Sequence, residues 1–91
     1  MDKTNKHCFA IFTEKGDGVL DIYGDAFRIN SPGVSVSSKI SFITFLENAG
    51  ALPLAKVSAV LKFYDYLGGQ RSANFAIHDS DFLALKKIVG K

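Results

Sequence analysis

The 91-residue chain has no tryptophan, one cysteine and two prolines, and its formal net charge is only +2. The single cysteine, Cys8, cannot form an internal disulfide, and no apolar run approaches the length of roughly 18 residues that a membrane-spanning helix needs. The first residues, MDKTNKHCFAIF, lack the long apolar segment of a secretory signal. We therefore expect a cytoplasmic protein in a reducing compartment, with no membrane association.

The small net charge also limits the classes of partner. Eleven basic residues against nine acidic ones are not a strong indication of nucleic acid binding, and they exclude a strongly acidic mimic of DNA. Residues 46–91 hold six basic and four acidic side chains, whereas residues 1–45 hold five of each. Any positive surface is therefore expected in the C-terminal half.

The chain does have enough apolar side chains for one core. Hydrophobic residues make up 47% of it, including eight phenylalanines and three tyrosines, and charged residues make up 22%, which is a globular composition. A chain of this size buries about two thirds of its surface on folding. We expect a single compact domain over residues 1–91, with residues 1–6 as a flexible N-terminal tail.

The first third of the chain predicts antiparallel strands. The apolar runs HCFAIFT and VLDIY are separated by EKGDG, whose glycines suit a hairpin turn, and AFRIN follows a second turn at GD and ends at SPG. Residues 34–37 add a short strand. The pattern indicates a β-meander of three to four strands. Four aromatic side chains are expected at inward strand positions, three in the meander and one on a later strand: Phe9, Phe12, Phe27 and Phe75.

The second half predicts mostly helices. Ser38 is expected to cap a helix over residues 39–49, and Pro53 to begin a second helix that ends at Gly68 and Gly69. Apolar residues of the second helix follow at helical spacing: Val57, Val60, Leu61, Tyr64 and Leu67. SANFAIH then predicts a strand, and Asp79 or Ser80 is expected to cap a helix over DFLALKKIV. The expected fold is α+β, a meander followed by α-α-β-α.

Candidate chemical sites are interpreted mainly as structure. In YLGGQRSANF the glycines follow a predicted helix, which favours a C-terminal cap over a phosphate-binding loop. HDSD, residues 78–81, suits a helix start better than a metal or acid–base cluster. Cys8 is expected as a small core residue, and an enzyme that pairs it with His78 is the third-ranked hypothesis. We expect no cofactor and no metal.

One stretch carries a resemblance to a known family. FLENAGALPLAKVSAVLKFYDYLGGQRSANFAIH resembles the helix, turn, recognition helix and wing strand of winged-helix DNA-binding domains. The resemblance implies that five side chains contact DNA or RNA, mostly through phosphates: Lys56, Lys62, Arg71, Ser72 and Asn74. Lys86 and Lys87 complete the set of basic candidates in this half of the chain.

The predicted second helix also has a second apolar edge, formed by Ala59, Phe63 and Tyr66. If the other edge enters the core, Phe63 and Tyr66 are expected to form a surface patch, which is typical of an interface. The first hypothesis is a small non-enzymatic protein-binding regulator or inhibitor that binds another protein or a second copy of itself, including an origin in a phage or other mobile element. The alternative is a nucleic-acid-binding regulator with a winged-helix-like C-terminal half.

Overall fold

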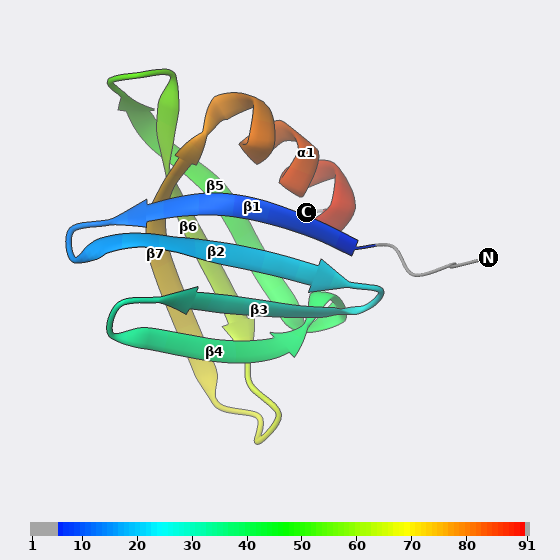
Figure 1. Ribbon diagram of the computed structural model, residues 1–91. Coiled ribbons are helices and arrows are strands. Elements are labelled where there is room, and N and C mark those ends of the chain that lie inside the picture. Colours follow the sequence, from blue (N-terminus) through cyan, green and yellow to red (C-terminus); the bar gives the residue numbers. More distant parts are fainter. Residues whose placement is uncertain (1–5, 91) are drawn as a thin grey trace.

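The computed structural model describes residues 6–90, which form seven strands, a short 3-10 helix and one α-helix (Figure 1). The elements follow in this order: β1 (Lys6–Thr13), β2 (Gly16–Tyr23), β3 (Ala26–Ser31), β4 (Val34–Lys39), η1 (Ile40–Phe42), β5 (Ile43–Leu52), β6 (Lys56–Tyr64), β7 (Gln70–His78) and α1 (Asp79–Val89). Apart from Lys6, which begins β1, the predicted N-terminal tail lies outside the described residues.

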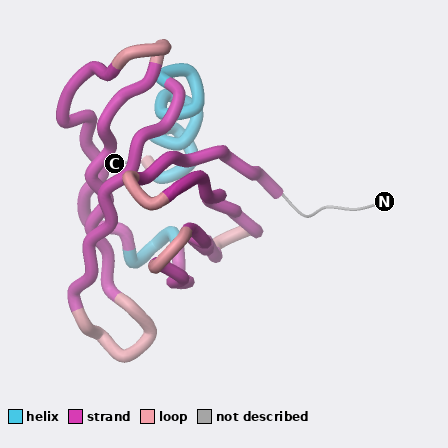
Figure 2. The backbone as a smooth tube through the Cα atoms, turned by 60° about the vertical axis from the view of Figure 1, so that its left-hand side comes forward, coloured by secondary structure: helices cyan, strands magenta, loops and turns pink. Residues whose placement is uncertain are grey.

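The strands form one antiparallel sheet in the order β4-β3-β2-β1-β7-β6-β5. Long ladders join neighbours within β1–β4 and within β5–β7, whereas β1 joins β7 through only two residue pairs, Ile11 with Ile77 and Phe12 with Ala76. The sheet turns at this short ladder. As a result, β1–β4 form a first layer and β5–β7 a second layer, and the strands of the two layers cross at a steep angle (Figures 1 and 2).

The hydrophobic core lies between the two layers. Side chains alternate across a strand, and four alternate residues of β6 are buried: Val57, Ala59, Leu61 and Phe63. The Phe63 ring meets Phe27 of the first layer edge to face, with 5.1 Å between ring centroids. Three residues of α1 bury their side chains in the same core: Phe82, Leu85 and Val89.

The strands predicted in the N-terminal third are present, with turns at the predicted glycine-containing segments. Gly24 and Gly33 have φ angles of 56° and 80°, a left-handed conformation that glycine adopts without steric cost. Three of the four aromatic residues predicted to face inward are buried: Phe9, Phe27 and Phe75. The prediction for Phe12 is wrong, because this ring lies on the outside of the sheet, where it contacts His78 and Lys56.

The prediction that the meander is followed by α-α-β-α is wrong. Residues 39–49 form η1 and most of β5, and the segment predicted as the second helix forms β6 and the turns on either side of it. Burial in β6 repeats every two residues, as in a strand, because Ala59 and Phe63 face the core while Val60 and Tyr64 face outward. The recognition helix of a winged-helix domain would coincide with β6, so that resemblance does not describe this fold.

Two predicted helix caps have other roles. Ser38 lies in β4, where its buried hydroxyl donates a hydrogen bond of 2.6 Å to the backbone carbonyl of Tyr64 and so joins the two layers. Gly68 and Gly69 belong to the loop between β6 and β7, where Gly68 reverses the chain with a φ angle of 83°. Neither position ends a helix, because the segments predicted as helices pair as strands.

The predicted strand at β7 and the predicted helix at α1 are both confirmed. The capping prediction is wrong in detail, because the N-cap position is His78 and no side chain donates or accepts a capping hydrogen bond there. Asp79 and Asp81 lie in the first turn, and Lys86 and Lys87 in the last, which complements the dipole of the helix at both ends.

Candidate functional site

A single carboxylate organises the loop between β6 and β7. Asp65 accepts hydrogen bonds from the backbone amides of Leu67, at 2.9 Å, and Gly69, at 2.8 Å, and its other oxygen lies 3.5 Å from the Arg71 guanidinium. Two backbone bonds between Asp65 and residues Gly68 and Gly69 close the loop. The Gly69 amide, together with the Leu67 amide and Arg71, lowers the pKa of the Asp65 carboxyl, since all three favour its charged form. The loop is therefore held in one shape by an ionised aspartate.

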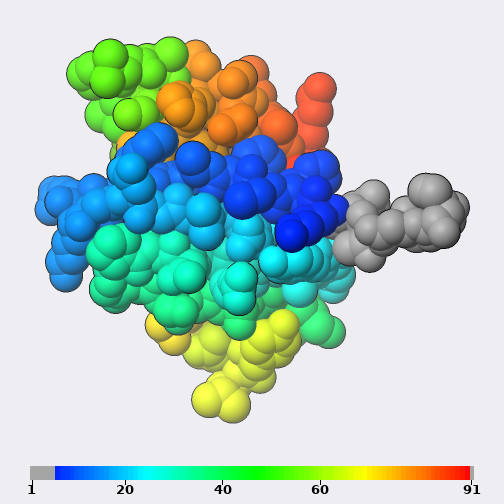
Figure 3. Space-filling view, in the orientation of Figure 1, coloured from blue at the N-terminus to red at the C-terminus, as the bar shows by residue number. Residues whose placement is uncertain are grey.

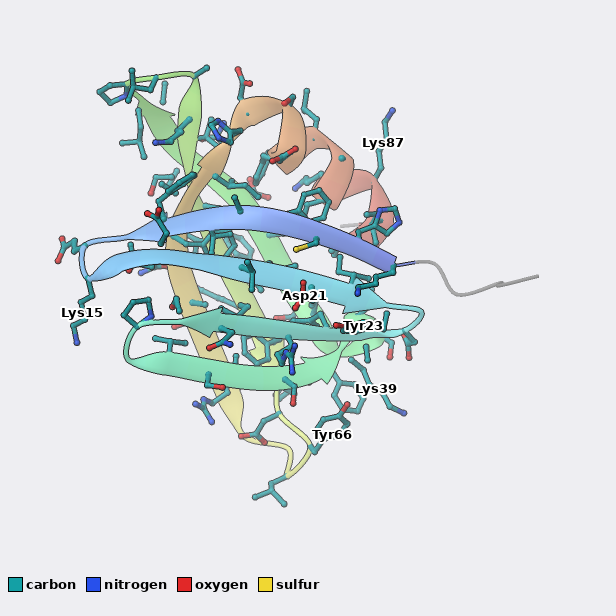
Figure 4. All side chains as sticks on the ribbon, viewed as in Figure 1. Lys15, Asp21, Tyr23, Lys39, Tyr66 and Lys87 are labelled. Carbon is teal, nitrogen blue, oxygen red and sulfur yellow. The ribbon has the colours of Figure 1, made fainter. Side chains whose placement is uncertain are left out.

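This loop presents apolar side chains to solvent. Leu67 is 96% exposed and Tyr66 58% exposed. The Tyr66 ring packs against Phe42 of η1, with 6.1 Å between centroids, and the Lys39 ammonium lies 5.7 Å from the centre of the Phe42 ring. The loop projects from the lower end of the molecule (Figure 3), and Tyr66 and Lys39 lie on the same side of that end (Figure 4). We call Lys39, Phe42, Tyr66 and Leu67 the loop surface.

Of the three residues predicted to form a protein interface, only Tyr66 is exposed. Ala59 is 0% and Phe63 2% exposed, so both belong to the core and the prediction that they reach the surface is wrong. The error follows from applying helical spacing to a strand. The same helical spacing placed Leu67 on the inward edge, although its side chain is almost fully exposed. That Tyr66 contacts a protein stays a prediction.

A second candidate surface is the side of the second layer that faces away from the core, which we call the outer face. It consists of the outward residues of β6 (Lys56, Ser58, Val60, Lys62 and Tyr64), their neighbours on β7, and two rings from the adjoining strands, Phe12 and Phe45. Two of its lysines lie over aromatic rings: Lys56 is 4.0 Å from the centre of Phe12, and Lys62 is 5.0 Å from that of Phe45. These are cation–π contacts.

Two hollows lie along the outer face. One of about 420 Å³ adjoins the β6–β7 loop and is lined by residues that include Thr44, Lys62, Tyr64, Gln70, Arg71 and Ser72. The other, of about 670 Å³, extends from this face to the β1–β2 and β3–β4 turns, and its lining includes Phe12, Lys15, Leu52, Ser58 and Asn74. Both are within the size range of small-molecule sites.

The five basic residues predicted to contact nucleic acid do not form one surface. Three lie on the outer face or line its smaller hollow: Lys56, Lys62 and Arg71. Lys86 instead fixes α1 to β5, because its ammonium donates a hydrogen bond to the Leu46 carbonyl and lies 3.6 Å from the Glu47 carboxylate. Lys87 is exposed on α1 at the opposite end of the molecule from the loop surface (Figure 4).

Cys8 and His78, the two residues of the third-ranked hypothesis, each contact other groups. Cys8 is exposed rather than buried in the core, and its hydrogen bond to the Asp21 carboxylate raises the pKa of its thiol. Asp21 also pairs with Arg28 at 3.4 Å. A raised pKa disfavours the thiolate, which is the nucleophilic form. The aromatic contact of His78 is with Phe12, so these contacts provide no support for a Cys8–His78 pair.

Sequence reasoning missed Lys39, Phe42 and Leu67 of the loop surface and Phe45 of the outer face. The segment DYLGG contains a usable signal, because an aspartate followed by glycines between two apolar runs is typical of a hairpin loop. Interpreted as a hairpin loop, the segment would have predicted an exposed side chain for Leu67. The position of Phe42 and Phe45 follows from η1 and from a register shift in β5 between Ile43 and Phe45, which have no comparable local signal.

Within residues 6–90, no group of three potential metal-ligating side chains comes together, and no helix has the length and apolar character needed to cross a membrane. Comparison with known proteins finds no family model that matches the chain and no curated protein that matches its sequence.

Proposed function

We propose that the chain is a non-enzymatic binding module that acts as a regulator or inhibitor by docking its loop surface on another protein. The observation that carries this proposal is the exposure of Leu67 and Tyr66 on a loop whose shape Asp65 holds. A leucine that is almost fully exposed contributes nothing to the core, whereas a tyrosine is among the residues that most often carry the binding energy of a protein interface, and an aliphatic side chain beside it can fill a pocket of the partner.

The order of the loop also supports binding. Fixing a loop on association costs free energy, and a loop that is already fixed avoids that cost. Here the carboxylate of Asp65 satisfies two backbone amides, and the Phe42 ring supports Tyr66 from the side. Tyr66 and Leu67 are therefore presented in one arrangement, as in a preorganised binding loop.

The proposal is tested by affinity capture from nuclease-treated lysate of the cells in which the protein occurs. Tyr66→Ala combined with Leu67→Ala removes both anchors, and we expect this variant to lose the captured protein. Because both side chains are exposed, the variant is expected to keep the thermal stability of the wild type. If the partner is a second copy of the chain, the purified wild type should sediment as an oligomer. The variant should then sediment as a monomer.

A matched control replaces two other exposed apolar residues, Leu54 and Leu83, by alanine. Leu54 lies in the turn between β5 and β6 and Leu83 on α1, both at the opposite end of the molecule from the loop surface (Figure 1). We expect this control to retain the partner. Equal capture by the loop variant and the wild type would show that the loop surface is not the interface.

A further inference from the structure

The outer face of the second layer has no role in the proposed protein contact. Residues Phe45, Lys62 and Tyr64 lie close together on it, because Phe45 of β5 pairs with Lys62 of β6 and Tyr64 follows two residues later on the same side. Phe45 and Tyr64 are each 38% exposed, which leaves part of each ring open to solvent. This corner of the sheet therefore offers two partly open rings beside an exposed ammonium.

The arrangement of ring and cation occurs again at the far end of β6. There the Lys56 ammonium lies over Phe12, whose ring is perpendicular to that of His78, with 5.5 Å between the ring centroids. Lys56 and Lys62 are six residues apart on one strand, a separation of about 20 Å. Between them the face carries Ser58 and, on β7, Asn74, which can donate and accept hydrogen bonds. Rings and cations thus alternate along an extended track.

Cations outnumber carboxylates along this track, where Lys56 and Lys62 share the face with Glu47, which lies opposite Val60. The smaller hollow is lined by Lys62 and Arg71, and its described lining contains no carboxylate. Arg71 adds a cation at the rim of this hollow, but it pairs with Phe63 across β6 and β7, so its side chain points to the opposite side of the sheet, where it lies 3.5 Å from Asp65. The larger hollow adds Lys15 and one carboxylate, Glu14. A ligand that lies along both hollows would therefore meet more cations than anions.

We propose that the outer face binds single-stranded nucleic acid, with bases stacked on Phe45 and Tyr64 and phosphates contacted by Lys62 and Lys56. Proteins that bind single strands combine aromatic stacking platforms with a positively charged track, which is the combination found here. The face is a sheet surface with two hollows and presents no helix to a major groove, which favours a single strand over a duplex. An acidic protein segment would use the lysines but would not need the rings.

The test measures fluorescence anisotropy of labelled DNA and RNA oligonucleotides of about 12 nucleotides. The titration starts at about 50 mM salt and is repeated at higher salt. Phe45→Leu keeps an apolar side chain but removes the ring, and we expect it to weaken binding at least about fivefold. Phe45→Tyr should restore the affinity. Lys62→Ala should reduce the slope of log affinity against log salt by about 0.7, the contribution of one phosphate contact.

The first layer provides matched controls. Tyr23 is also 38% exposed and carries Lys6 at 5.4 Å from its ring centre, but this pair does not line either hollow of the outer face. Tyr23→Leu and Lys6→Ala should leave both affinity and salt slope unchanged. Comparison of the DNA and RNA probes identifies which strand is preferred.

Two results would overturn the proposal. One is the absence of binding at low salt with about 100 µM protein, where even non-specific binding registers. The other is binding that Phe45→Leu leaves unchanged, together with equal binding of a poly-glutamate peptide, which would assign the face to an acidic protein segment.

Discussion

The two faces of β6 differ in what they contribute to the molecule. The inner face carries Ala59, Leu61 and Phe63, each at most 2% exposed, and it meets the first layer across the core. The outer face carries Lys56 and Lys62, which lie over the rings of Phe12 and Phe45, and Tyr64, which is 38% exposed. Because successive side chains point to opposite sides of a strand, one nine-residue segment supplies part of the core and part of a binding surface.

Because the two faces differ in this way, substitutions within one strand are expected to alter either stability or binding. Substitutions at odd-numbered positions from 57 to 63 should change the free energy of unfolding, and substitutions at the intervening positions should change binding. The first of three predictions compares the two faces, and the other two concern the contacts that hold the end of β6.

The largest effect is expected for Phe63→Ala. Removal of this buried ring leaves a cavity beside Phe27 and should lower the free energy of unfolding by about 3–5 kcal/mol. Tyr64→Ala changes the adjacent residue on the outer face and should cost about 0.5 kcal/mol or less. Urea denaturation of both variants measures the difference. Similar losses in the two variants would contradict the assignment of the faces.

A smaller effect is expected for Ser38→Ala, which acts where the end of β6 meets β4. The variant leaves the Tyr64 carbonyl without the hydroxyl that donates to it, at an expected cost of about 1–3 kcal/mol. Ser37→Ala, an exposed change on the same strand, is the control and should have little effect. If both variants unfold at the wild-type urea concentration, the Ser38 hydrogen bond does not hold the layers together.

The smallest effect concerns Asp65, the first residue beyond β6. Its pKa is lowered in the folded state, so its contribution to stability is fully present above the ordinary aspartate pKa of about 4 and is lost as the pH falls through the lowered folded value. The stability difference between wild type and Asp65→Asn should therefore shrink below about pH 4.

Urea midpoints measured from neutral to acidic pH test this prediction, with Asp17→Asn as the control for a change of net charge at an exposed site in β2. A difference between wild type and Asp65→Asn that is the same at every pH would show that the charge of Asp65 does not stabilise the loop.

The first three strands could be predicted from the sequence, because each apolar run is short and ends at a turn that contains glycine. The sequence was also sufficient for α1, whose acidic start and basic end are typical of a helix. It was insufficient for β6, because outward Val60 and Tyr64 combine with inward Val57 and Leu61 to reproduce helical spacing.

The turn before β6 added to the error. Leu54 and Ala55 adopt φ angles of 66° and 59°, which suit a tight hairpin, but the usual Asn-Gly signal of such a turn is missing. The preceding Pro53 was interpreted as a helix start instead. Of the predicted interface only Tyr66 is exposed, since the position of a side chain on one face or the other depends on the period assigned to its segment.

The strand order has a consequence for how the chain folds. Among the described residues, β1–β7 is the one ladder that joins strands distant in sequence, and it contains two residue pairs. Each layer can form from hairpins between neighbouring strands, and contacts that are local in sequence speed folding. The slow part of the conformational search is then the closure of β1 on β7, which can occur only after the chain has been synthesised as far as residue 77.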